Sequence, residues 1–238
     1  MEMMPKYLVV VAGGSGTRMG AAMPKQFLQL EGRPILLRTL ERFVEAVPDI
    51  HIVTVLPKDH IEYWKELCIR YSFTVPQRLV AGGITRFHSV KNALSKVPAG
   101  ALVAVHDGVR PLVSVALIRE MFGRMDHCRA LIPVTPVTDT LKLLEKAEDG
   151  SLKTKDGPSP DRSFLYGAQT PQIFHSEDLL SAYAQAFDTS FTDDASVVAK
   201  AGVPLSWTEG ERFNLKITCP EDLILAKAIL RSSCSCNP

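Results

Sequence analysis

The sequence predicts an α/β protein with a mainly parallel sheet that is covered by helices on both faces. Short apolar runs rich in β-branched residues alternate with longer segments of helical periodicity, and turns with glycine or proline separate them. Hydrophobic residues make up 46% of the 238 residues, as expected for a folded chain. Alternating strands and helices build βαβ units, which produce a parallel sheet with helices on both sides.

The first part of the chain shows this alternation clearly. The expected strands are short apolar runs, namely Tyr7–Val11, His51–Leu56, Arg78–Ala81 and Ala101–Val105. The expected helices have apolar residues at three- and four-residue spacing, and they cover Ile35–Val47, a segment from Ile61 to Cys68, Arg86–Val97 and Val115–Met125. Pro34 suits the first turn of its helix, and Asp59 with Glu62 forms a plausible capping pair for the next one.

After the strand expected at Ala130–Val134, residues of about 135–165 interrupt the pattern. Prolines, glycines and charges separate short β-like pieces such as Thr140–Leu144. A structureless segment of this length is unusual inside a compact domain. It is either a flexible insertion or an arm that finds its partner elsewhere, for example on a second subunit. We expect residues 1–238 to form one domain that carries this insertion.

The regular pattern then returns to the end of the chain. Helical segments are expected at Glu177–Phe187, Asp193–Lys200 and Glu221–Leu230, the last with Pro220 at its start. Leu205–Thr208 and Asn214–Thr218 have the composition of strands.

Charge and composition exclude several classes of protein. Lys and Arg number 27 and Asp and Glu 26, so the net charge of +1 argues against a nucleic-acid binder. No apolar run approaches the roughly 20 residues of a membrane span, and the N-terminal residues lack the features of a signal peptide. The five cysteines form no CxxC motif, and the CxC of Cys234 and Cys236 suits a frayed tail. These features indicate a cytoplasmic protein.

Ligands of open parallel sheets bind at the carboxyl ends of the strands, so the residues after each strand are the first candidates. The loop after the first strand contains Ala12, Gly13, Gly14, Ser15 and Gly16, with Arg18 and Lys25 close behind. Glycines let backbone N–H groups approach a phosphate, and two cations add to this. The spacing fits neither a P-loop nor the dinucleotide fingerprint. A phosphate ligand is favoured over a plain glycine-rich turn.

Polar residues follow other strands as well. Gly83 and Ser89 lie after the third strand, where an ordinary strand-to-helix turn explains them equally well. Asp107 and Gly108 come after the fourth, and an aspartate at a strand end beside a phosphate loop is a natural Mg²⁺ ligand, unless it is only a turn residue. Lys216 needs either an anion or an exit to solvent.

No nucleophile-elbow GxSxG occurs in the chain, and no nucleophilic triad emerges. The candidate residues instead provide a phosphate-binding loop, cations and one carboxylate. This set suits transfer at a phosphorus centre, where a protein mainly positions groups and neutralises charge.

Seven motifs in order give the chain a specific resemblance. They are AGGSGTRMGAAMPKQF, GGITRFHSV, HDGVRPLV, PVTDTLK, YGAQTPQIF, TDDASVV and NLKITCPEDLILA. From about Tyr7 to Leu230 the chain resembles the 2-C-methyl-D-erythritol 4-phosphate cytidylyltransferase family. The resemblance implies a Rossmann-like fold of the nucleotidyltransferase type, and a homodimer in which the arm at about 135–165 reaches the neighbouring subunit's site. It also implies the reaction of CTP with methylerythritol phosphate, with Mg²⁺, to give the CDP-alcohol and pyrophosphate.

The resemblance also implies roles for individual residues. Ala12–Gly16 would hold CTP, Gly83 and Ser89 would help to read its cytosine, and Asp107, followed by Gly108, would lie at the Mg²⁺ and ribose side. The implied catalytic residues are Arg18, Lys25, Arg162 and Lys216, of which the first two bind the triphosphate. The implied sugar-phosphate contacts are Arg110, Thr140 and Arg162, the last two from the partner's arm, and Thr170, Thr192 and Lys216 complete the acceptor pocket.

Some positions depart from common forms of the family. Gly108 and Val109 stand where two alanines are frequent, Ile84 stands where an acid can occur, and Phe213 replaces an acid that could help to bind metal. A second carboxylate ligand is therefore in doubt.

Other functions remain open at this point. The nearest alternative is ribitol 5-phosphate cytidylyltransferase, which shares the glycine-rich loop. A uridylyl- or guanylyltransferase fits the later motifs less well. A nicotinamide-dependent oxidoreductase is disfavoured by Met19 and by Leu56-Pro57-Lys58, where an acid should close the second strand. A non-catalytic nucleotide-binding module would hold CTP without releasing pyrophosphate.

Overall fold

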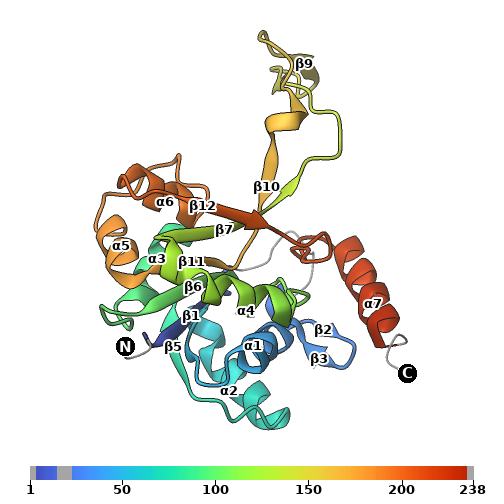
Figure 1. The fold of residues 1–238 in the computed structure, drawn as a ribbon. Coiled ribbons are helices and arrows are strands. Elements are labelled where there is room, and N and C mark those ends of the chain that lie inside the picture. Colours follow the sequence, from blue (N-terminus) through green and yellow to red (C-terminus); the bar gives the residue numbers. More distant parts are fainter. Residues whose placement is uncertain (1–3, 15–22, 235–238) are drawn as a thin grey trace.

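An eight-stranded sheet forms the centre of the molecule (Figure 1). The computed structural model describes residues 4–14 and 23–234. In the sheet, β1 (Lys6–Val11), β4 (His51–Leu56), β5 (Gln77–Ala81) and β6 (Leu102–Asp107) are parallel neighbours in the order β6-β1-β4-β5. The strands expected in the first part of the chain are therefore confirmed, and their carboxyl ends lie at one edge.

The other half of the sheet mixes strand directions. Strand β11 (Gln172–His175) runs antiparallel between β6 and β7 (Ala130–Pro136), and β10 (Tyr166–Ala168) runs antiparallel to β7. Strand β12 (Ser206–Glu209) pairs parallel to β7. The mainly parallel sheet is confirmed, although the sequence pattern gave no sign of β10 and β11.

Helices pack on both faces of the sheet because successive strand residues point to opposite sides. Leu8 and Val10 of β1 face one apolar cluster together with α1 (Ile35–Ala46), α2 (Ile61–Arg70) and α4 (Val115–Gly123). Tyr7 and Val9 face a second cluster with α3 (Arg86–Leu94), α5 (Ser176–Ala182) and α6 (Asp194–Lys200). The prediction of helices on both faces is thus confirmed.

The C-terminal helix α7 (Pro220–Cys234) packs beside a small two-stranded sheet of β2 (Gln29–Leu30) and β3 (Arg33–Pro34). A third apolar cluster lies here, and it includes Leu30, Ile217 and Ala226. Short 3-10 turns complete the body at Lys25–Phe27, Lys58–His60 and Met125–His127.

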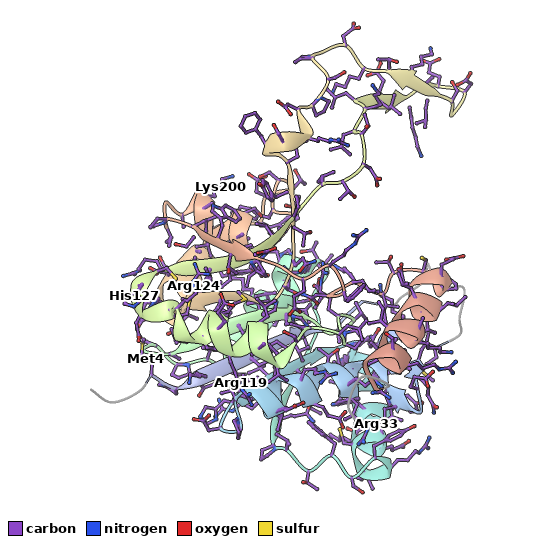
Figure 2. All side chains as sticks on the ribbon, turned by 45° about the vertical axis from the view of Figure 1, so that its right-hand side comes forward. Met4, Arg33, Arg119, Arg124, His127 and Lys200 are labelled. Atoms are coloured by element: carbon purple, nitrogen blue, oxygen red, sulfur yellow. The ribbon has the colours of Figure 1, made fainter. Side chains whose placement is uncertain are left out.

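The arm comprises residues 137–165 and projects from the body between β7 and β10 (Figure 1). Its tip is a hairpin of β8 (Leu144–Lys146) and β9 (Leu152–Thr154), and a 3-10 turn at Arg162–Phe164 leads back. Figure 2 shows side chains standing out on all sides of this thin segment, in contrast to their dense packing in the body. The segment expected as a loop or an arm is therefore an extended arm with its own hairpin.

Three local predictions were wrong. Asn214–Thr218 is not a strand, because its backbone bonds to loops: the Asn214 carbonyl accepts from Arg110, and Ile217 N–H donates to the Val109 carbonyl. The Asp59–Glu62 cap does not form, since His60 occupies the N-cap of α2 without a side-chain bond. The helix expected to reach Phe187 ends at Ala182, whose carbonyl accepts from the Gln185 side chain.

Within the part of the chain that the structure describes, no helix has the length and apolar character needed to cross a bilayer.

Candidate active site

A cavity of about 560 Å³ opens at the carboxyl ends of β1, β5 and β6. Its walls come from four separate stretches of chain: the loop after β1 with the following 3-10 turn, the turn before α3, the end of β6, and the segment before α7. The lining residues are Val11, Ala12, Gly13, Gly14, Lys25, Gln26, Gly83, Ile84, Thr85, Arg86, Ser89, Asp107, Val109 and Lys216. This is the edge where ligands of open parallel sheets bind.

The loop after β1 is fixed by a buried glutamine. Gln26 Nε2 donates hydrogen bonds to the carbonyls of Ala12 at 2.7 Å and Gly14 at 3.1 Å. The same 3-10 turn carries Lys25 into the cavity wall. The predicted site residues Ser15, Gly16 and Arg18 lie outside the described residues.

Gly83 and Ser89 form the opposite wall. Ser89 Oγ accepts from Gly83 N–H and donates to the Thr85 carbonyl, both at 3.0 Å, and Thr85 caps α3. A Cβ atom on Gly83 would lie 2.5 Å from His88 Cβ, so glycine is required by this close approach. Ile84 is 95% exposed at the rim of the cavity.

Asp107, at the end of β6, is the acidic residue in the cavity wall, and it is only 6% exposed. Its Oδ2 lies 3.0 Å from Lys216 Nζ and 3.3 Å from Arg110 Nε, and its Oδ1 lies 3.6 Å from Arg86 Nε. Burial alone would raise the pKa of Asp107, but Arg86, Lys216 and Arg110 outweigh it and hold that pKa well below its usual range. Asp107 is therefore an ionised carboxylate surrounded by cations.

A buried polar network behind Asp107 fixes the end of β6. Asp107 N–H donates to Thr170 Oγ1 at 3.1 Å, and Thr170 Oγ1 lies 3.0 Å from His106 Nδ1. His106 Nε2 lies 3.2 Å from the Arg110 carbonyl, which can only accept. Nε2 thus carries the proton, and Nδ1 accepts from Thr170. Burial lowers the pKa of His106 to about 3, so the imidazole is neutral.

The remaining predicted residues near the cavity occupy supporting positions. Gly108 lies beneath the loop after β1, where a Cβ atom would approach Ala12 Cβ to 2.9 Å. Arg110 Nη1 donates to the Asn214 carbonyl at 2.7 Å, so this arginine is tied to the segment that carries Lys216. Thr192 is exposed just before α6, and the neighbouring Asp193 caps that helix.

Two further predicted residues lie on the arm. Thr140 and Arg162 are exposed, and Arg162 Nη1 donates to the Thr138 carbonyl of the same arm at 2.9 Å. Figure 1 shows the arm extending away from the body of its own chain.

Arg86 and Asp194 are two charged residues to which the sequence analysis gave no role. Arg86 Nη2 donates to Asp194 Oδ2 at 2.6 Å, and Asp194 is fully buried. Both residues belong to motifs that carry the family resemblance, Arg86 to GGITRFHSV and Asp194 to TDDASVV. Their contact could not be predicted, because the two residues lie far apart in the chain and no spacing pattern links them.

The donor set fits a magnesium ion only if the nucleotide supplies most of its ligands. The described residues contain no group of three or more His, Cys, Asp or Glu side chains able to hold a metal. Mg²⁺ usually takes one or two carboxylates together with substrate phosphates and waters. Asp107 meets that requirement as a single ionised carboxylate in the wall of the cavity.

Comparisons with known proteins agree closely. Residues 7–232 match the family model described as IspD: 2-C-methyl-D-erythritol 4-phosphate cytidylyltransferase. Enzymes of that name from Porphyromonas gingivalis W83 and Bacteroides thetaiotaomicron are 49% and 44% identical, over 95% of this chain and 98% and 100% of theirs. The crystal structure of the Anaerococcus prevotii 4-diphosphocytidyl-2C-methyl-D-erythritol synthase is 28% identical, with a TM-score of 0.76 over 96% of this chain and 99% of that chain. The Thermus thermophilus cytidylyltransferase is 32% identical, with a TM-score of 0.71 over 94% and 98%.

Proposed function

The chain belongs to the 2-C-methyl-D-erythritol 4-phosphate cytidylyltransferase family, and from this we propose how its residues transfer a cytidylyl group from CTP to that sugar phosphate. The reaction forms 4-diphosphocytidyl-2-C-methyl-D-erythritol and releases pyrophosphate. The observation that carries the proposal is the cavity at the sheet edge, where a glycine loop, Lys25 and the cations around Asp107 converge.

CTP occupies the cavity between the loop after β1 and the turn before α3. Gly83 and the fixed Ser89 hydroxyl offer polar groups to the cytosine, and Ala12, Gly13 and Gly14 let the nucleotide approach the backbone. Lys25, and Arg18 with Ser15 and Gly16 by resemblance, contact the triphosphate. A fixed cation at this position stabilises the charge that develops on the phosphate oxygens during transfer.

The acceptor lies on the Lys216 side of the cavity. Its phosphate is already an anionic nucleophile near neutral pH, so no general base is needed, and the main barrier is the approach of two anions. Lys216 is 40% exposed and ion-paired with Asp107, which places a cation where it can turn to an incoming phosphate. Arg110 and Thr192 contribute to this side, and Thr170 supports it from behind, since its hydroxyl bonds to Asp107 N–H and His106.

Mg²⁺ is part of the proposal, with Asp107 as the residue that would hold it. The ion supplies charge neutralisation on the phosphates when it is bound with the nucleotide. Asp107 is ionised and its backbone is fixed by Thr170, so its carboxylate would be available to the ion once Lys216 turns from Oδ2 to a substrate phosphate.

A homodimer with exchanged arms completes the site in this proposal. The arm leaves its own body (Figure 1), and a hollow of about 590 Å³ beside its base is lined by exposed aromatic residues: Phe164 of the arm, Tyr166 of β10 and Trp207 of β12. Phe164 is 81% exposed. Exposed apolar surface of this kind marks interaction sites, and a second copy would bring Thr140 and Arg162 to the acceptor. Residues 1–238 then act as one domain, and the cytoplasmic location stays a prediction.

Pyrophosphate release tests the function directly. CTP and Mg²⁺ are incubated with methylerythritol 4-phosphate in one reaction and with ribitol 5-phosphate in a parallel one. We expect turnover with the first acceptor. Turnover with ribitol 5-phosphate alone would keep the chemistry and overturn the acceptor, and CTP binding without pyrophosphate release would indicate a binding module.

A further inference from the structure

Arg86 bridges two carboxylates that belong to different elements. It is the first residue of α3 and lines the cavity. Its Nε lies 3.6 Å from Oδ1 of Asp107 on β6, and its Nη2 lies 2.6 Å from Oδ2 of Asp194 on α6. A cation at the first turn of a helix opposes the helix dipole, so the two carboxylates must account for its position.

The Asp194 side of this bridge is anchored in the core. Asp194 is fully buried, and the Tyr183 hydroxyl donates to its Oδ1 at 2.5 Å. The Tyr183 ring stacks on Phe87, with ring centroids 4.8 Å apart, and Phe87 stacks on Phe191. Neither Tyr183 nor Asp194 lines the cavity. Asp194, with Tyr183 bonded to it, therefore fixes the Arg86 guanidinium from the side away from the cavity.

On the other side of the bridge, three cations contact the Asp107 carboxylate, and their side chains differ in exposure. Lys216 and Arg110 contact Oδ2, whereas Arg86 contacts Oδ1. Lys216 is considerably more exposed than Arg86, whose side chain is 27% exposed. When substrates draw Lys216 away, Arg86 remains as the contact to Oδ1, with its other end fixed by Asp194.

We propose that Arg86 is a positioning residue, which fixes the Asp107 carboxylate for the nucleotide and aligns it with the start of α6. The turn before α6 carries Thr192, so the same guanidinium connects the nucleotide side of the cavity to the acceptor side. This inference rests on the proposed role of Asp107. A lysine could not replace the arginine, because a single ammonium cannot contact both carboxylates with the fixed geometry of a guanidinium.

The first test is Arg86→Lys, with kcat, CTP affinity in the absence of acceptor, and melting temperature measured together. We expect kcat to fall about 10- to 100-fold, because a small misplacement of a reacting group has effects of this size. CTP affinity should change by no more than about threefold, because the lost alignment acts mainly in the transition state. The control is Arg129→Lys, since Arg129 also forms a two-point pair with an aspartate, Asp178, but on the surface.

Tyr183→Phe provides a second test that leaves every cavity residue intact. It removes one hydroxyl behind Asp194, and we expect kcat to fall about 3- to 10-fold. Tyr71→Phe is the control, because it removes a tyrosine hydroxyl that accepts from Gln29 at the body surface. The proposal rests on this variant alone if Arg86→Lys does not fold.

Three outcomes would overturn the positioning role of Arg86, and a fourth would overturn the role of Asp107 on which it rests. Arg86→Lys with wild-type kcat, or a Tyr183→Phe variant that loses only melting temperature, overturns the positioning role. The positioning role is also wrong if Arg86→Lys keeps its kcat but loses kcat/KM and CTP affinity by the same factor, because Arg86 would then act only in binding CTP. Asp107→Asn is measured beside them: if that variant keeps full turnover, the proposed role of Asp107 fails, whatever Arg86 does.

Discussion

The carboxyl end of β6 and the arm both carry residues of the proposed active site, the first on the nucleotide side and the second on the acceptor side, but they hold them in different ways. Asp107 is buried, and its three cationic neighbours come from α3, the loop after β6 and the segment before α7. Arg162 is exposed, and its Nη1 donates a hydrogen bond to the Thr138 carbonyl of the same arm.

This difference shows which part of the site a single chain can complete. The charges around Asp107 are oriented by contacts that already exist in one subunit, so the nucleotide side is preorganised. In the arm, by contrast, Arg162 bonds to the arm's own backbone, and exposed leucines and aromatics include Leu152 and Phe164. We infer that the arm residues become ordered contributors only when a second subunit covers them.

The largest effect should come from Lys25→Ala on the preorganised side. Loss of one fixed cation that stabilises transition-state charge is expected to reduce turnover about 10²- to 10³-fold, while the melting temperature stays nearly unchanged. Steady-state pyrophosphate release and a thermal melt measure both quantities. The control is Lys58→Ala, since Lys58 also opens a 3-10 turn. Turnover near the wild-type value would remove Lys25 from the mechanism.

The second largest effect on turnover is expected from a substitution in the arm. Arg162→Ala should reduce turnover by about 10²-fold through loss of one charged contact to the acceptor, without changing CTP affinity. Lys146→Ala on β8 is the control within the same arm.

Mixed dimers then decide whether the arm acts across subunits. If it does, random pairing of the Arg162→Ala and Lys25→Ala proteins creates heterodimers with one intact site, so about a quarter of the wild-type activity should return. If activity does not return in a mixture that is shown to exchange subunits, Arg162 does not act in the partner's site. The proposed difference between the arm and the carboxyl end of β6 would then be wrong.

A smaller effect is expected from Gly83→Ala in the nucleotide wall. The added Cβ would lie 2.5 Å from His88 Cβ and 2.9 Å from the His88 carbonyl carbon, so the turn must shift. Overpacking of this kind costs about 1–3 kcal/mol, which corresponds to roughly a 5- to 150-fold rise in the Kd for CTP if the strain falls on binding. Titration calorimetry with CTP measures it. Gly123→Ala is the control, because open space surrounds a Cβ there, and unchanged affinity in Gly83→Ala would show that this wall is not preorganised.

The smallest effect is expected on the pH dependence of stability, through His106 in the buried network behind Asp107. The pKa of His106 is lowered to about 3 by burial, below its value of about 6.5 in the unfolded chain. Between these values only the unfolded chain binds the proton, so the free energy of unfolding decreases as pH falls from about 6.5, by up to about 1.4 kcal/mol per pH unit.

Denaturant unfolding of wild type and His106→Gln across this range measures the slope. The variant should be less stable but less sensitive to pH, whereas His127→Gln, at an exposed position labelled in Figure 2, should keep the wild-type slope. Equal slopes for all three proteins would show that His106 is not held neutral.

The sequence by itself determined the parts that depend on local pattern. The apolar runs defined β1, β4, β5 and β6, and the residues after them defined the edge where the cavity opens. Motif order was enough to identify the family and its reaction.

Only the tertiary structure decided which charged residues meet. Lys216 and Arg86 lie far from Asp107 in the chain, and neither spacing nor residue type reveals that both reach its carboxylate. Asn214–Thr218 has the composition of a strand, yet the Asn214 carbonyl and the Ile217 N–H bond to Arg110 and Val109 in the loop after β6. Propensity is a weak, local preference, whereas the pairing of buried charges is set by the low-dielectric interior, where every carboxylate must find a cation or a donor.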